Sequence, residues 1–162
     1  MAEGMPTLAI GVKEFLDERG WRYQFDSQKN AFTLGLNIDS RLKKIDMIIQ
    51  ADEKAILVYG VCPIKADEGS MAVAAEFFAR ANYMLKLGNF DIDHRDGELR
   101  FNTCLVGRDA PSPDAIGHAI VTPFEMWKTF GDGLLAVLFG GASPEGEIRK
   151  IREKIEKGLS DA

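Results

Sequence analysis

The chain has 162 residues, of which 46% are hydrophobic and 28% charged, with a net charge of −5 and a pI near 5.1. These values are typical of one globular domain, and the absence of a concentrated basic run argues against nucleic-acid binding. No apolar run approaches the roughly 18 residues of a membrane helix, and the acidic start is not that of a secretory signal, so we expect a cytoplasmic protein.

The first third of the chain predicts a leader, a helix and four strands. We expect residues 1–6 to form a flexible leader and residues 7–162 a single α+β domain. The apolar stripe of the first helix ends at Gly20, and strands follow near residues 21–25, 32–38, 45–49 and 55–62. Their short connections predict an antiparallel meander. The segment 55–62 is almost entirely apolar, so we expect it to be the most buried strand.

A helix over residues 70–87, followed by a hairpin, organises the middle of the chain. Phe77, Phe78 and Met84 lie on one apolar stripe of this helix, and Gly88 is expected to end it. The segment that follows alternates in polarity, with Asp96-Gly97 as a two-residue turn. The sequence therefore predicts an antiparallel sheet, made of the meander and the hairpin, with helices packed on it.

Two further helices are predicted in the last third. One begins after Ser112, is expected to kink or break at Pro123, and carries Trp127 and Phe130 on its apolar stripe. These aromatic residues, with Met126, belong to the core or line a ligand groove.

The last helix is predicted over residues 144–158. Ile148, Ile151 and Ile155 lie on one face of it. A terminal helix with such a face buries it against its own domain or against a partner, and the sequence leaves both readings open.

Catalytic and metal-binding motifs are absent from the sequence. His94 and His118 have no further ligand at metal-binding spacing, and the spacing of the acidic residues at 91–98 does not fit a calcium loop. Cys62 and Cys104 are isolated and are expected to be free, buried thiols. We therefore expect no enzyme, no metal and no cofactor.

The order helix, meander, long helix, hairpin and helix resembles the YbjN domain family, which shares the type III secretion chaperone-like fold. The similarity is carried by the opening FLDERGWRYQFD, by the central helix and hairpin, and by the closing FGGASPEGEI. The matching positions are Asn82, Gly88, Phe90, Asp91, Asp96, Gly97, Gly140, Gly141, Ser143 and Pro144. The resemblance implies a non-enzymatic regulator with no catalytic residues. It also implies dimerisation and the holding of extended client segments.

The sequence thus predicts a chaperone-like or regulatory module that binds another protein, without nucleic acid or membrane, as a homodimer. The surplus of apolar helix faces is the basis of this interpretation, with an added strand or a helix in a groove as the expected contact. The candidate contact residues are Phe77, Phe78, Met84, Trp127, Phe130, Ile148, Ile151 and Ile155. The alternative is a small-ligand sensor with an apolar pocket near Trp127 and Tyr59.

Overall fold

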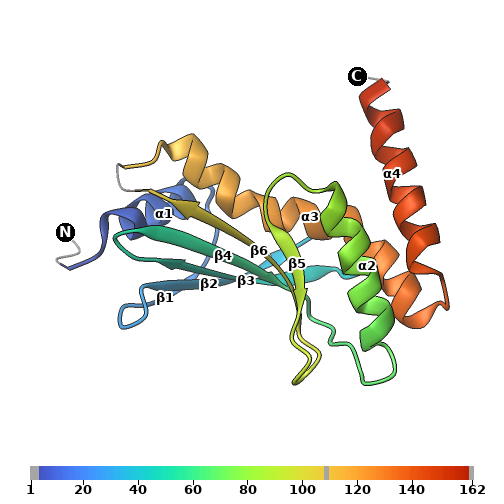
Figure 1. Ribbon diagram of the computed structural model, residues 1–162. Helices are drawn as coiled ribbons and strands as arrows, with labels where there is room; N and C mark the ends of the chain where they lie inside the picture. The colour runs from blue at the N-terminus through green and yellow to red at the C-terminus, as the bar shows by residue number, and fades with distance from the viewer. Residues whose placement is uncertain (1–3, 108–109, 161–162) are drawn as a thin grey trace.

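The structure is a computed structural model that describes residues 4–107 and 110–160, so the first half of the predicted 1–6 leader lies outside the described residues. It contains one six-stranded antiparallel sheet and four helices, which confirms the predicted fold class (Figure 1). The strand order is β1-β2-β3-β4-β6-β5. The elements are α1 (Thr7–Glu18), β1 (Gln24–Asp26), β2 (Ala31–Asn37), β3 (Lys44–Ala51), β4 (Ala55–Val61), α2 (Met71–Met84), β5 (Asn89–Ile92), β6 (Leu99–Val106), α3 (Pro113–Phe139) and α4 (Pro144–Ser160).

The helices lie on one face of the sheet. Alternate strand residues point toward them and are buried, as where Phe32 pairs with Ile49 and Phe90 with Phe101. Helices α1 and α3 pack on the sheet, and α2 packs on β5, where Phe78 stacks on Phe90. Helix α4 packs outside this layer, against α2 and α3 (Figure 1). The molecule is therefore layered as sheet, helices and outer helix.

Helix α3 continues through Pro123, where the sequence predicted a kink or a break. Proline at this position leaves the carbonyl of Ala119 without its helical donor. The hydroxyl of Thr103, on β6, donates to that carbonyl at 2.9 Å. A side chain of the sheet thus supplies the missing hydrogen bond, and the helix continues from Pro113 to Phe139.

Close approach of α3 to β4 depends on Gly60. A Cβ at this glycine would lie 2.8 Å from the Cβ of Pro123, closer than side chains tolerate. The carbonyl of Gly60 also accepts a 2.8 Å hydrogen bond from Nε1 of Trp127. The indole is therefore fully buried with its polar group satisfied.

Three predicted boundaries in the sheet and at α2 were wrong. Helix α2 ends at Met84, and Gly88, at φ +72°, instead precedes β5. The hairpin turn holds residues 94–97 between a paired Asp93 and Glu98, with Gly97 at φ +79°. Strand pairing at the first strand begins only at Gln24.

Asp132 fastens α3 to the loop between β2 and β3. Its Oδ1 accepts from the hydroxyl of Ser40 at 2.9 Å and from the backbone N–H of Arg41 at 2.6 Å. Partial burial would raise the pKa of Asp132, but these two hydrogen bonds, together with the positive charges of Arg41 and Lys154, outweigh burial and lower it. The charged form is thus the one that the fold stabilises.

Replacing Asp132 by alanine is expected to lower the free energy of unfolding by about 1–2 kcal/mol at pH 7, because two bonds to a charged, partly exposed acceptor are lost. A lowered pKa contributes stability above the ordinary pKa of the carboxyl, and this stability is lost as the pH falls through the folded value. Urea unfolding from pH 7 to pH 3 should therefore show the two proteins converging at low pH. Glu125→Ala, exposed on the same helix, is the control; equal losses in both variants would contradict the anchoring role.

Candidate protein-interaction surface

The sheet face opposite the helices is uncovered by any described element, and we call it the open face. Its centre is apolar: Ile48, Leu57, Tyr59 and Val61 lie there, half-buried, on β3 and β4. Strand β4 contains no exposed residue, as expected of the strand predicted to be the most buried, but only one of its two sides packs against helices. Ile56 and Val58 are fully buried against the helices, whereas the alternate residues face outward. We refer to Ile48, Leu57, Tyr59 and Val61 as the apolar strip.

A shallow trough of about 590 Å³ lies beside the apolar strip, over β1, β2 and β3. Its floor includes Gly35, which pairs with Asp46 on β3. A Cβ at Gly35 would meet only Oδ1 of Asp46, at an ordinary 3.8 Å. The glycine therefore leaves a hollow in the surface at this point, and core packing does not require it.

The other side of the apolar strip is bordered by a polar network on β5 and β6. The carboxylate of Asp91 accepts from the side-chain amide of Asn89 at 2.8 Å and from that of Asn102. The Arg100 guanidinium lies 3.7 Å from the same carboxylate and 4.8 Å from the ring centre of Tyr59. An apolar centre with a hydrogen-bonded polar border is the usual composition of a protein interface.

Two carboxylates of the acidic hairpin, those of Asp93 and Asp96, are paired with basic side chains. Hydrogen bonds from the side chain and backbone of Arg95 hold the pKa of Asp93 far below its ordinary value. Lys65 lies 2.6 Å from Asp96 and likewise lowers the pKa of that carboxyl. Asp93 and Asp96 thus each have their own cation, and no group of three or more metal-ligating side chains occurs within residues 4–107 and 110–160.

The β5 edge of the sheet is blocked by Asn82 of α2. Its side-chain amide donates to the carbonyl of Phe90 at 3.0 Å and accepts from the N–H of Phe90 at 2.7 Å. These are the backbone groups that an added strand would use. The opposite edge strand, β1, has only three residues. Both edges therefore disfavour the added-strand contact that we expected.

Most of the predicted contact residues are buried within the chain. Phe77, Phe78, Trp127, Phe130 and Ile148 belong to the core, and Met84 and Ile151 pack against it. Met84 and Ile151 are partly buried, and Ile155, at 39% exposed, is the most exposed of the eight. The surplus of apolar helix faces is thus mostly taken up by α2, α3 and α4 packing on one another.

Trp127 and Tyr59, near which the alternative interpretation expected an apolar ligand pocket, lie on opposite sides of the sheet. Trp127 is fully buried on the helix side of β4, whereas Tyr59 faces the opposite side with Arg100. The two residues therefore lie on either side of the sheet and share no cavity.

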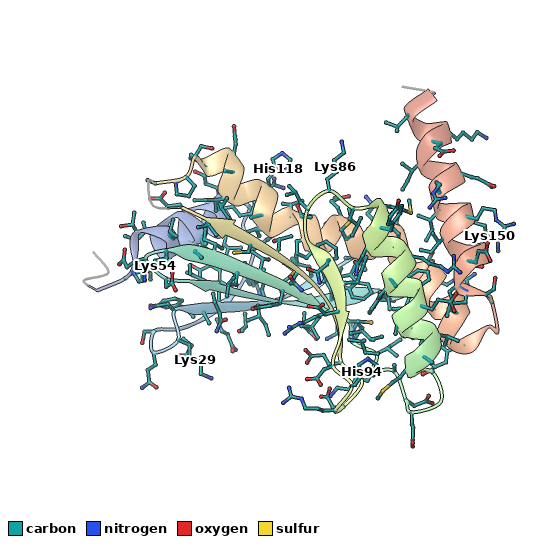
Figure 2. The ribbon with its side chains drawn as sticks, viewed as in Figure 1. Lys29, Lys54, Lys86, His94, His118 and Lys150 are labelled. Atoms are coloured by element: carbon teal, nitrogen blue, oxygen red, sulfur yellow. The ribbon has the colours of Figure 1, made fainter. Side chains whose placement is uncertain are left out.

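The thiols and imidazoles form no reactive cluster. Burial raises the pKa of Cys62 to about 11, so this thiol stays protonated at neutral pH. Cys104 is free but exposed, which corrects the expectation that both thiols are buried. His94 and His118 are exposed (Figure 2). These residues offer no paired acid and base for catalysis.

Sequence reasoning missed the open face, although a signal for it existed. The segment 55–61 lacks the polar alternation of a strand with one solvated face. We interpreted this as the sign of the most buried strand of the sheet. Helices cover only one side of β4, so its outward-pointing apolar residues form part of the protein surface.

The comparisons with known proteins agree with this fold. The model of the YbjN family, described as "putative bacterial sensory transduction regulator", matches residues 11–136. The crystal structure of YbjN from E. coli, described as a putative transcription regulator, aligns with a TM-score of 0.57 at 13% identity, over 79% of this chain and 91% of that chain. No curated protein matches the sequence. Within the described residues, no helix has the length and apolar character to cross a membrane.

Proposed function

Because this chain belongs to the YbjN family, we propose that it is a non-enzymatic regulatory module that binds a segment of another protein on the open face. The observation that carries the proposal is the apolar strip. Leu57, Tyr59 and Val61 point away from the helices on a central strand and stay half-buried, with no element of the described chain lying over them.

The open face favours contact through side chains over contact through strand edges. The apolar strip supplies area to bury, and the border at Arg100 and Asn102 supplies hydrogen bonds. The trough at Gly35 admits a side chain of the partner. An extended segment or a helix lying across β3 and β4 would meet all three features.

The proposal predicts that Leu57→Thr/Tyr59→Thr/Val61→Thr abolishes partner capture while the protein remains folded. Threonine keeps the strand preference but removes most of the apolar area. The measurement is affinity purification from the native host with quantitative mass spectrometry, using the full chain as bait. Leu87→Thr/Phe139→Thr, which removes exposed apolar side chains elsewhere, is the matched control.

A second variant separates binding from stability. Gly35→Thr adds a side chain to the trough without an internal clash, so its melting temperature should equal or exceed that of the wild type. Capture of the same protein should nevertheless fall. Proteins retained equally by the wild type, by Gly35→Thr and by the triple variant would show that the open face is not the binding surface.

We include in the proposal the homodimer expected from the sequence. Its support is the resemblance to a fold whose members commonly dimerise, together with exposed apolar side chains such as Tyr83 and Leu87. Sedimentation velocity of the full chain at micromolar concentration should give twice the 17.9 kDa chain mass. A monomer at all concentrations would remove the dimer and leave the open-face proposal intact.

A further inference from the structure

A groove of about 530 Å³ runs between α2 and α4, on the side of the molecule opposite the open face. The two helices run side by side in the same direction (Figure 1). Each contributes residues at helical spacing i, i+3, i+4 and i+7. The lining residues are Glu76, Ala79, Arg80 and Tyr83 from α2, and Glu145, Ile148, Arg149 and Arg152 from α4.

The outer half of α4 extends this groove beyond the end of α2. Every residue from 152 to 159 is exposed, and these turns project from the body of the protein (Figure 1). Ile155 and Leu159, at 39% and 73% exposed, lie on the same side of α4 as Ile148, which is buried near the start of the helix. Tyr83, at 91% exposed, lies at the upper end of α2. Helices of this length gain most of their stability from packing. The exposed apolar face of Ile155 and Leu159 has no such packing neighbour among the described residues.

The charges of the groove identify the kind of neighbour that it lacks. Arg80 is paired with Glu76 at 2.9 Å. Arg149 and Arg152, by contrast, have no carboxylate within 4.0 Å among the described residues. The lining carries three arginines and two glutamates, a net charge of +1 in a protein of net charge −5. Unpaired arginines beside apolar side chains favour carboxylates, which they bind in bidentate fashion.

We propose that the α2–α4 groove binds an acidic amphipathic helix of a partner protein. Its apolar residues pack on Tyr83, Ile155 and Leu159, and its carboxylates pair with Arg149 and Arg152. A helix fits better than a strand because both walls are helices, whose backbone groups are already paired. The groove is separate from the open face, and α4 lies beyond residues 11–136, which the family model matches.

The test uses two fluorescein-labelled synthetic helices with leucines at the same i, i+3, i+4 positions, one flanked by glutamates and its twin by lysines. Fluorescence anisotropy with the full chain should show the acidic peptide binding at least about tenfold tighter than the basic twin. Arg149→Glu/Arg152→Glu should weaken acidic-peptide binding by about tenfold or more, and Ile155→Ser/Leu159→Ser should also weaken it. The open-face triple threonine variant should bind it as the wild type does.

Lys29→Glu/Lys54→Glu is the matched control, because it makes the same change in net charge at the far end of the sheet (Figure 2). It should leave binding of the acidic peptide unchanged. Equal affinity for both peptides, or an equal loss in this control, would overturn the proposal. A change in the sedimenting mass of the groove variants without a change in peptide binding would assign the groove to a second copy of the chain and would likewise overturn it.

Discussion

Replacing Gly97 by alanine is expected to lower the free energy of unfolding by at least about 3 kcal/mol, because two penalties add. The residue has φ +79°, which side chains rarely adopt. A Cβ there would also lie 1.9 Å from the carbonyl oxygen of Ala66. That neighbour is backbone and is itself held, since the N–H of Ala66 donates to the carbonyl of Gly97 at 2.9 Å.

Urea denaturation followed by circular dichroism measures this loss. Gly158→Ala is the matched control, because the same methyl group is added at an exposed helical site with nothing within 4 Å. It should leave stability unchanged or raise it by up to about 1 kcal/mol. A Gly97→Ala variant as stable as the control would contradict the described contact between the hairpin and the segment before α2.

Trp127→Ala should destabilise the protein by about 3–5 kcal/mol, because it empties the largest fully buried side-chain site. Trp127 meets Phe78 and Phe90 edge-on, at 6.2 and 5.1 Å between ring centres. Trp127→Phe should lose less, about 1–2 kcal/mol, chiefly from the hydrogen bond to Gly60. Urea unfolding of the variants gives both values.

The comparison with Trp21 makes this result specific. Trp21 is half-buried beside Phe15, so Trp21→Ala should cost clearly less than Trp127→Ala. In the Trp21→Phe protein, the remaining emission from Trp127 should be shifted to short wavelength, as in a dry environment. If Trp127→Ala lowered the free energy of unfolding by less than about 1 kcal/mol, Trp127 would not be part of the packed core, and an apolar ligand pocket near it would be favoured again.

The strands were predictable because alternation is a local signal. Phe32, Leu34 and Leu36 recur at every second residue, and short polar turns allow only antiparallel neighbours. The passage of α3 through Pro123 was not predictable in this way. It depends on Thr103, which is distant in the sequence and reaches Ala119 only when β6 lies beneath the helix.

The candidate site was less accessible to sequence reasoning than the fold. An apolar stripe such as that of Phe77 and Phe78 has the same pattern whether it is buried by its own chain or by a partner. Only the three-dimensional contacts of Phe77 with Phe130 on α3, and of Phe78 with Phe90 on β5, show that the stripe is buried internally. The open face escaped notice for the converse reason, since Leu57 and Val61 resemble interior residues in the sequence.

Site-specific photo-crosslinking in the native host tests the central claim, that a protein partner lies on the open face. The photoreactive amino acid p-benzoylphenylalanine replaces Tyr59 in one protein and Glu53, exposed in the turn before β4, in another. We predict a covalent protein adduct at position 59 that is absent at position 53 and disappears when Gly35→Thr is added. No adduct at position 59, or the same adducts at both positions, would contradict the assignment of the open face.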